Sequence, residues 1–183
     1  MNIATTKAAA AAIKRHYNNT GEQTPKYSGQ YFKQTTSGPR WTYCSGYSII
    51  TSPDPLPGLE QLPDMGQLDP VEFMENHLYS FKPTSRREYH LPAENVTRAA
   101  VEAWRKNKEN NGLAYAIQDR GQEIGVNARY LSDLMTIYPK ALVYVAGPLD
   151  PIILSDAGPL EPVALVMPVR LDANRAGHAR RTA

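Results

Sequence analysis

The order of apolar and polar residues at the start of the chain predicts one short helix. Residues 5–17 contain a run of alanines, which have high helix propensity, and Thr5 or Thr6 can cap the first turn. Lys14 and Arg15 lie near the C-terminal end of this segment, where the helix dipole favours cations. The polar stretch that follows, "NNTGEQTP", is typical of a loop that ends a helix.

Strands joined by a tight turn are predicted next. The segments 28–36 and 40–52 are rich in strand-forming residues, alternate apolar and polar positions in part, and are separated only by "SGP". Ser45 and Gly46 interrupt the second segment, so it forms either two strands that meet at a turn or one bulged strand. From Pro53 onward the chain is rich in proline, and about residues 53–88 are predicted to form a long surface insertion.

A second helix is predicted at about residues 93–108. Pro92 suits the first helical turn, and Gly112 ends the helical pattern. One face of this helix would carry Val96, Ala100, Ala103 and Trp104.

The last third of the chain predicts a hairpin, a helix and three further strands. "LAYAIQ" and "QEIGV" flank a turn at 119–121, and Asn127 can cap a helix whose apolar residues recur at three- and four-residue steps: Leu131, Leu134, Ile137 and Tyr138. Strands are expected at 141–147, 151–156 and 162–171. This order, β-α-β-β-β, predicts a helix that lies across one face of a four-stranded layer.

Composition is typical of a globular protein and excludes some kinds of site. The 183 residues include 42% hydrophobic residues, enough for a buried core, and the net charge is only +2. Because Cys44 is the single cysteine, the chain can form neither an intramolecular disulfide nor a cysteine-based zinc site. The sequence shows no HExxH, GxSxG or phosphate-binding loop, so we expect no enzyme activity, metal or cofactor. It shows no secretory signal or membrane span either, so we expect a cytoplasmic protein.

Three blocks in the last third match a known family in order and spacing. They are the strand, cap and helix of "IGVNARYLSDLM", the strand that runs into "GPLDPIIL", and the terminal "VMPVRL". Together they cover roughly residues 122–171 and resemble the last β-α-β-β-β unit of the bacterial DNA polymerase sliding clamp, the beta subunit of DNA polymerase III. The resemblance implies an α+β fold: a DNA-clamp-like domain made of two β-α-β-β-β units, with helices on one face of the sheets.

A weaker similarity to the same family lies upstream, in "GQYFKQTTSGPRWTYCSGYSII". The segment has the family's layout of strand, turn and strand, although Ser45 and Ser48 replace the family's Asp and Arg. With the N-terminal helix it would form the first unit of a single clamp-like domain over residues 1–171. The segment at about 53–88 would then be an insertion between the units, and the helix at about 93–108 an addition to the family's layout.

The resemblance implies a partner-peptide pocket near the C-terminal strand. In the family this strand ends beside a hydrophobic pocket that binds short peptide motifs of polymerases and other partners. Matched one by one, Leu165 and Met167 correspond to strand positions that line the pocket, and Asp150 and Pro151 to a turn at its edge. The rest of the pocket would come from an adjacent domain. Leu165 and Met167 can equally belong to one face of a core strand, since methionine is common in both settings.

The resemblance also implies DNA-backbone contacts by basic side chains on the helices. Lys7, Lys14 and Arg15 on the first helix and Arg129 on the last are the candidates. Ordinary solvated cations explain the same residues, and Arg129 can form a surface pair with Asp133 four residues later.

Two further features have alternative explanations. Residues 172–183 are expected to form a basic disordered tail, and Arg175, Arg180 and Arg181 make this tail a candidate arm for the DNA backbone. Aromatic residues near the first strands could stack on single-stranded bases or simply pack and pair across strands: Tyr27, Tyr31, Trp41, Tyr43 and Tyr47.

The function implied by the resemblance is that of a non-catalytic DNA-replication accessory or clamp-like binding module. Such a module would contact the phosphate backbone of double-stranded DNA, or it would bind replication proteins or another clamp subunit. The alternative is a protein–protein scaffold or inhibitor that competes for clamp contacts without binding DNA. A clamp ring contains about six such domains, and the sequence shows no sign that both edges of this domain are self-complementary. We therefore expect a monomer or dimer.

Overall fold

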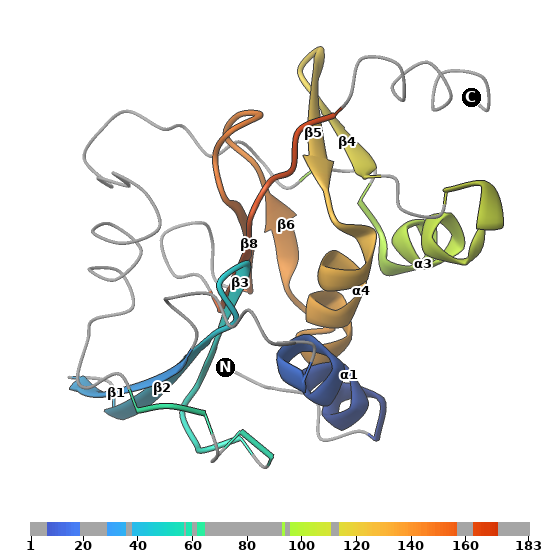
Figure 1. The fold of residues 1–183 in the computed structure, drawn as a ribbon. Coiled ribbons are helices and arrows are strands. Elements are labelled where there is room, and N and C mark those ends of the chain that lie inside the picture. Colours follow the sequence, from blue (N-terminus) through green and yellow to red (C-terminus); the bar gives the residue numbers. More distant parts are fainter. Residues whose placement is uncertain are drawn as a thin grey trace.

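The computed structural model describes residues 7–18, 29–35, 38–56, 58–59, 62–64, 93, 96–110, 114–156 and 163–171. The helices within these residues are α1 (Lys7–Asn18), α3 (Arg98–Lys106), the short 3-10 helix η2 (Lys108–Asn110) and α4 (Ala128–Ile137). The strands are β1 (Gly29–Thr35), β2 (Gly38–Cys44), β3 (Ser48–Ser52), β4 (Tyr115–Asp119), β5 (Gln122–Val126), β6 (Leu142–Tyr144), β7 (Ile152–Ser155) and β8 (Ala164–Val166). Helices and an antiparallel sheet are thus combined in one mixed fold (Figure 1).

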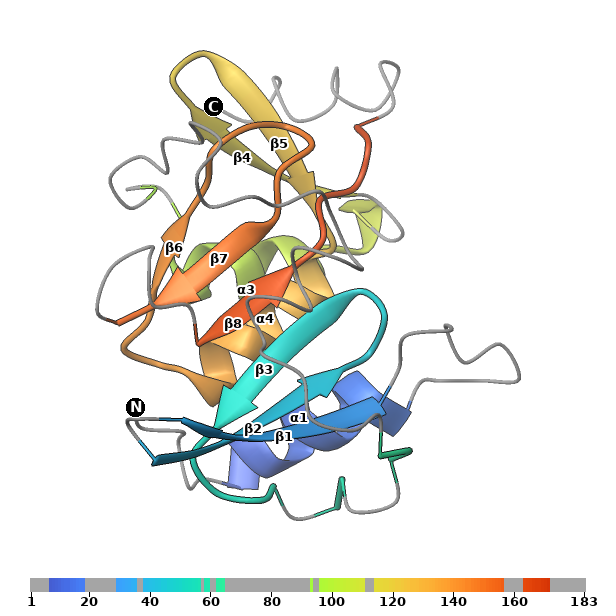
Figure 2. The same ribbon diagram turned by 90° about the vertical axis from the view of Figure 1, so that its left-hand side faces the viewer.

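Six strands form the main sheet, in the order β1-β2-β3-β8-β7-β6, and each neighbouring pair is antiparallel. Its two halves are each a helix followed by three strands: α1-β1-β2-β3 and α4-β6-β7-β8. The last strands of the two halves, β3 and β8, pair at the centre, with Ser48 opposite Val166. Figure 2 shows the sheet in front and the three α-helices together behind it. The prediction of a mixed fold of helices and sheet is confirmed, whereas the clamp-like arrangement of two β-α-β-β-β units stays a prediction.

The first half of the sheet follows the predicted strand, turn and strand. β1 and β2 pair over their whole length, with Thr35 opposite Gly38 at the turn. The predicted second segment is two strands and not one bulged strand, because Gly46 takes a φ of 83° at the turn between β2 and β3. This left-handed conformation is accessible to glycine without a steric penalty.

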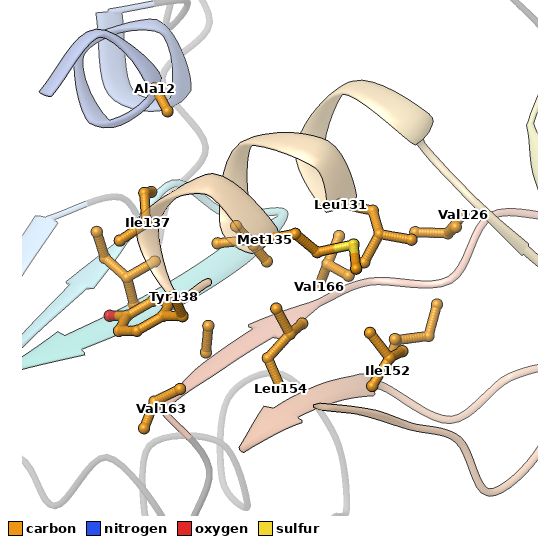
Figure 3. Packing of buried hydrophobic residues seen from close by; sticks show 14 of the residues in the cluster. Ala12, Val126, Leu131, Met135, Ile137, Tyr138, Ile152, Leu154, Val163 and Val166 are labelled. Atoms are coloured by element: carbon orange, nitrogen blue, oxygen red, sulfur yellow. The ribbon is translucent and has the colours of Figure 1, made fainter. Parts of the chain in front are cut away.

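Helix α4 forms as the sequence predicts and is the centre of the core. The Asn127 side chain accepts hydrogen bonds from the backbone N–H groups of Arg129 and Tyr130, which satisfies two donors of the first turn. Figure 3 shows Leu131 of α4 and Tyr138, the residue that follows the helix, on the side that faces β7 and β8, where Ile152, Leu154 and Val166 lie. The Tyr138 hydroxyl also donates to the carbonyl oxygen of Thr51 at 2.6 Å, which connects α4 to β3 in the other half.

The strand before α4 does not join the main sheet, so the predicted four-stranded layer is wrong in this point. β5 pairs with β4 in a separate two-stranded hairpin, with Ile117 opposite Ile124. The hairpin turn at Arg120 and Gly121 has positive φ at both positions. That geometry suits the right-handed twist of two short strands and favours their pairing with each other.

The predicted C-terminal strand, 162–171, is also divided between two sheets. Only β8 pairs within the main sheet, and beyond it Pro168 bridges to Val126 of β5. Proline has no N–H to donate to a ladder, so the change of partner occurs where the chain passes through it. The N–H of Val169 then donates to the carbonyl oxygen of Gly125 at 2.9 Å.

Helix α3 begins later than predicted. It starts at Arg98 and ends at Lys106, and the Thr97 hydroxyl caps it by accepting a hydrogen bond from the N–H of Ala100. Val96 therefore precedes the helix, and Ala103 is exposed instead of lying on its buried face. The β-branched hydroxyl residue is a better start than the upstream proline because it satisfies a free N–H of the first turn.

Both faces of the main sheet are buried at its centre, in β3, β8 and β7. On the helix side Ile50, Val166 and Leu154 pack beneath α4. On the opposite side Ile49, Leu165 and Ile153, which pair across three neighbouring strands, are each at most 2% exposed. A strand buried on both faces is apolar at successive positions, as in "ALV" of β8.

Part of the predicted insertion at 53–88 is described. The N–H of Gln30 donates to the carbonyl oxygen of Pro63, and Gln30 bridges to Asp64, so residues 62–64 lie along the outer strand β1. The remainder of this segment, and the predicted tail at 172–183, lie outside the described residues. None of the three described α-helices is long and apolar enough to cross a membrane.

Candidate nucleic-acid interface and partner surface

The basic residues predicted on α1 are placed differently from one another. Lys7 and Lys14 are exposed, as a contact with DNA phosphates requires. The Arg15 guanidinium instead lies 2.6 Å from Oδ1 of Asp133 on α4. Arg15 is therefore part of the contact between the two helices, although 42% of its side chain remains exposed.

Asp133 is buried, so the predicted surface pair with Arg129 does not describe it correctly. Its side chain is only 3% exposed, and Oδ2 has no hydrogen-bond partner among the described residues. Arg129 is exposed on the first turn of α4. The error arises because spacing along one helix cannot show that a second helix covers the carboxylate.

The outer, polar side of α4 is covered as well as its apolar side. Ser132, Asp133 and Thr136 are all buried, and α1 and α3 both pack against α4. Figures 1 and 2 both place α4 between these two helices. From Leu131 to Tyr138 every residue of this segment is buried, so phosphate contacts by α4 are restricted to its N-terminal end.

Helix α3 brings exposed cations that the sequence analysis did not single out. Arg105 and Lys106 are in its last turn, where the helix dipole favours cations, and Lys108 follows in η2. Glu102 lies between Arg98 and Lys106 and pairs with both, at 3.1 and 3.7 Å. The hydrogen bond from Arg98, with the nearby positive charges, holds the pKa of Glu102 below its usual value. The signal for this surface was present in the sequence as the basic run "RKNK".

Charges are segregated between the two layers of the described structure. We define the helix layer as residues 7–18, 98–110 and 127–140. It contains nine basic residues against three acidic ones: Lys7, Lys14, Arg15, Arg98, Arg105, Lys106, Lys108, Arg129 and Lys140 against Glu102, Glu109 and Asp133. The other described residues carry four basic and six acidic side chains: Lys33, Arg40, Arg120 and Arg170 against Asp54, Asp64, Asp119, Glu123, Asp150 and Asp156. A weakly charged chain therefore has one distinctly basic layer.

The residues predicted for the peptide pocket are divided between the core and one end of the sheet. Leu165 is 2% exposed at the centre of the sheet, so its side chain belongs to the core. Met167 is half-buried, and its N–H donates to the carbonyl oxygen of Tyr47 at 2.9 Å. Continuing the β7–β8 register beyond Ile152 and Val166 places Pro151 opposite Met167. Asp150 closes the preceding turn with a hydrogen bond from its N–H to the carbonyl oxygen of Gly147.

Exposed apolar side chains occur at the same end of the sheet. Tyr47 is 54% exposed, Leu149 68% and Val169 38%. Tyr47 is hydrogen-bonded to Met167 through the backbone, and Leu149 and Val169 lie two residues along the chain from Pro151 and Met167. The ring of Tyr47 stacks on that of Tyr130 from α4, with centroids 6.1 Å apart. Burial, and to a lesser degree the neighbouring Tyr47, raises the pKa of Tyr130. We call Tyr47, Leu149, Met167 and Val169 the strand-end patch.

The other aromatic candidates serve packing. Tyr31 and Tyr43 are at most 2% exposed, and Phe32 packs against Trp41 across the β1–β2 pair with ring centroids 4.8 Å apart. Because these rings are distributed over both faces of the sheet, they form no shared stacking platform. Tyr27 lies outside the described residues. Cys44 is fully buried, as expected for a small apolar residue.

Neither the remaining predicted residues nor the comparisons with known proteins identify a further site. Arg175, Arg180 and Arg181 lie outside the described part of the chain. Within that part, no three side chains of the His, Cys, Asp or Glu type come together as a metal site. No protein family model matches this chain, and neither a curated protein nor a solved structure shows significant similarity to it.

Proposed function

We propose that this chain is a non-catalytic, clamp-like binding module that contacts the backbone of double-stranded DNA through its helix layer. Two features support the proposal. The chain repeats a helix followed by three antiparallel strands and places both helices on one face of a shared sheet. That helix layer carries most of the basic residues of the described structure. The sequence resemblance to sliding clamps implies a set of helices that faces DNA and is supported by sheets, and helices on one face of the sheet support this proposal.

The concentration of cations in one layer is the observation that carries this proposal. Duplex DNA presents one negative charge per ~1.7 Å of its axis, and a protein gains affinity by releasing the counterions condensed on those phosphates. A net charge of +2 spread evenly would give little such binding. With exposed cations gathered on α1, α3 and the start of α4, the same chain can engage several phosphates at once. Such contacts do not depend on base sequence.

Binding of a fluorescent duplex of about 20 base pairs, followed by anisotropy at increasing salt, tests the proposal. Four phosphate contacts would give a slope of about −3.6 for the logarithm of affinity against that of salt concentration, or a loss of roughly 100-fold between 50 and 200 mM. Two duplexes of unrelated sequence should behave alike. Absence of binding at 50 mM salt, or a flat salt dependence, would contradict the proposal.

A second candidate function, a scaffold that binds a protein partner without DNA, is favoured by the strand-end patch. Three of its four apolar side chains are exposed and that of Met167 is half-buried, whereas most large apolar side chains of the described residues are buried. The patch includes Met167, which the family resemblance assigns to the partner pocket. The Leu165 side chain, being buried, would support this surface only from within.

A fluorescent peptide that carries a clamp-binding motif provides the test of this second candidate. We expect Tyr47→Ser to weaken binding at least tenfold if the patch receives the peptide, because the exposed ring is lost while the fold is retained. Leu142→Ser is the matched control, since Leu142 is also exposed, by 51%, but lies outside the patch on β6. Equal binding by wild type, Tyr47→Ser and Leu142→Ser would remove the support for this function.

A further inference from the structure

We infer that α3 together with α1, and not the pair α1 and α4, forms the DNA-contacting surface, with Arg105 and Lys108 as phosphate-contacting residues. The inference rests on the proposed function and assigns its contact residues. The helix α3 is the one that the family resemblance leaves unexplained. The resemblance implies that α4 would face DNA. Because α3 packs against α4, α3 offers its own exposed side chains in place of those of α4.

Burial of α4 is the first step of the inference. The side chains along a helix can contact phosphates only where they are exposed, and the polar side of α4 is covered where Ser132, Asp133 and Thr136 are buried. The basic group closest to that side, Arg15, is held by Asp133 at 2.6 Å. The central helix therefore provides at most Arg129, on its first turn, for DNA.

The charges on α3 are the second step. Glu102 is paired with Arg98 and Lys106 on the same helix, so these three side chains partly cancel one another. Arg105 and Lys108 are exposed beyond that group, and η2 places Lys108 directly after the helix. On α1, Lys7 and Lys14 are exposed, and the helix contains no acidic residue.

The spacing of the helices is the third step. Packed helices have axes ~8–10 Å apart, so two helices on either side of α4 lie up to roughly 16–20 Å apart. The major groove of B-DNA is ~12 Å wide. Cations on α1 and α3 can therefore reach phosphates on the two sides of a groove.

Three double variants, compared with wild type on the same fluorescent duplex, test this assignment. Arg105→Gln with Lys108→Gln, the α3 variant, changes the end of α3 and the start of η2 and leaves both partners of Glu102 in place. Lys7→Gln with Lys14→Gln changes α1, and Arg40→Gln with Arg170→Gln removes the same charge outside the helix layer. Circular dichroism and thermal unfolding verify that each variant is folded.

We expect the α3 and α1 variants each to lose about half of the salt dependence. Loss of two phosphate contacts lowers the slope by about 1.8, so a ~100-fold loss of affinity between 50 and 200 mM salt becomes roughly 10-fold. The control variant should retain the slope of wild type. If only the α1 variant loses salt dependence, this inference is wrong while the proposed function stands. If the control weakens binding as much as the other two, or the wild type does not bind, both are wrong.

Discussion

The Asp133 carboxylate is the most demanding single group in the helix layer. An ionised group that is 3% exposed loses most of its hydration, and one partner, Arg15, offsets this at Oδ1. Its other oxygen, Oδ2, is buried without a hydrogen-bond partner among the described residues. Loss of Arg15 would therefore leave the buried Asp133 carboxylate unpaired and destabilise the contact between α1 and α4.

Replacement of Arg15 should destabilise the protein more than replacement of its neighbour. Arg15→Ala leaves Asp133 buried and unpaired, and we expect a loss of about 2–4 kcal/mol in the free energy of unfolding, reduced from the fully buried case because Arg15 is partly exposed. Lys14→Ala, at an exposed position, should change it by less than about 0.5 kcal/mol. Denaturation in guanidinium measures both, and equal losses would show that the ion pair has no structural role.

Buried thiol and phenol groups predict a loss of stability at alkaline pH. Burial raises the pKa of the Cys44 thiol to about 11 and that of the Tyr31 hydroxyl to about 12. The unfolded chain loses these protons near pH 9 and 10, so stability is fully present below about pH 9 and declines as pH rises through the folded values, by about 1.4 kcal/mol per unit for each group.

Denaturation midpoints measured from pH 7 to 11 test this pH dependence. The midpoint should stay nearly constant up to about pH 9 and fall above it, and the fall should be shallower in Cys44→Ala, which lacks the thiol. An identical decline in wild type and Cys44→Ala would show that the thiol does not contribute.

Among the elements, the segment after β8 depends most on a single backbone position. A Cβ at Gly125 would overlap the carbonyl oxygen of Val169 and contact the side chain of Leu171. The absence of a side chain therefore allows residues 168–171 to cross β5 closely. Val169 of the strand-end patch lies in this crossing, where its N–H donates to the carbonyl oxygen of Gly125.

Gly125→Ala should displace that segment without unfolding the main sheet. We expect a destabilisation of about 1–3 kcal/mol, with faster amide exchange at Val169, whose N–H donates to Gly125. Gln118→Ala on the exposed side of the same hairpin is the control and should leave exchange at Val169 unchanged. Slow exchange at Val169 in Gly125→Ala would mean that the close approach has no structural consequence.

Elements with local signals could be predicted from the sequence, and long-range arrangements could not. The Asn127 cap with its apolar spacing predicts α4, and "SGP" predicts the turn between β1 and β2, because neighbouring residues determine both. The exit of β5 from the main sheet and the burial of Asp133 depend on segments far away in sequence. For the candidate site, Lys7 and Lys14 were correctly expected on the surface. The cations of α3 become candidates for DNA contact only because α1 and α3 cover α4, and the sequence does not show this packing.

At the scale of the whole molecule, the outer strands of the sheet already have hydrogen bonds to other segments. Gln30 of β1 donates to Pro63, and Val143 of β6 accepts from Ala93. Association with further copies through these strands would have to replace such bonds. The expectation of a monomer or dimer stays a prediction, which light scattering of the purified chain can check. The basic helix layer could contact DNA without assembly into a ring of several copies, because all of its described residues belong to one chain.

Mapping of backbone amide shifts by NMR, as a short duplex is added, tests most directly whether the helix layer contacts DNA. We expect the changes to concentrate in residues 7–18 and 98–110, to be independent of base sequence, and to disappear at high salt. Changes centred on the strand-end patch or on β1 and β2, or no changes at low salt, would contradict the account.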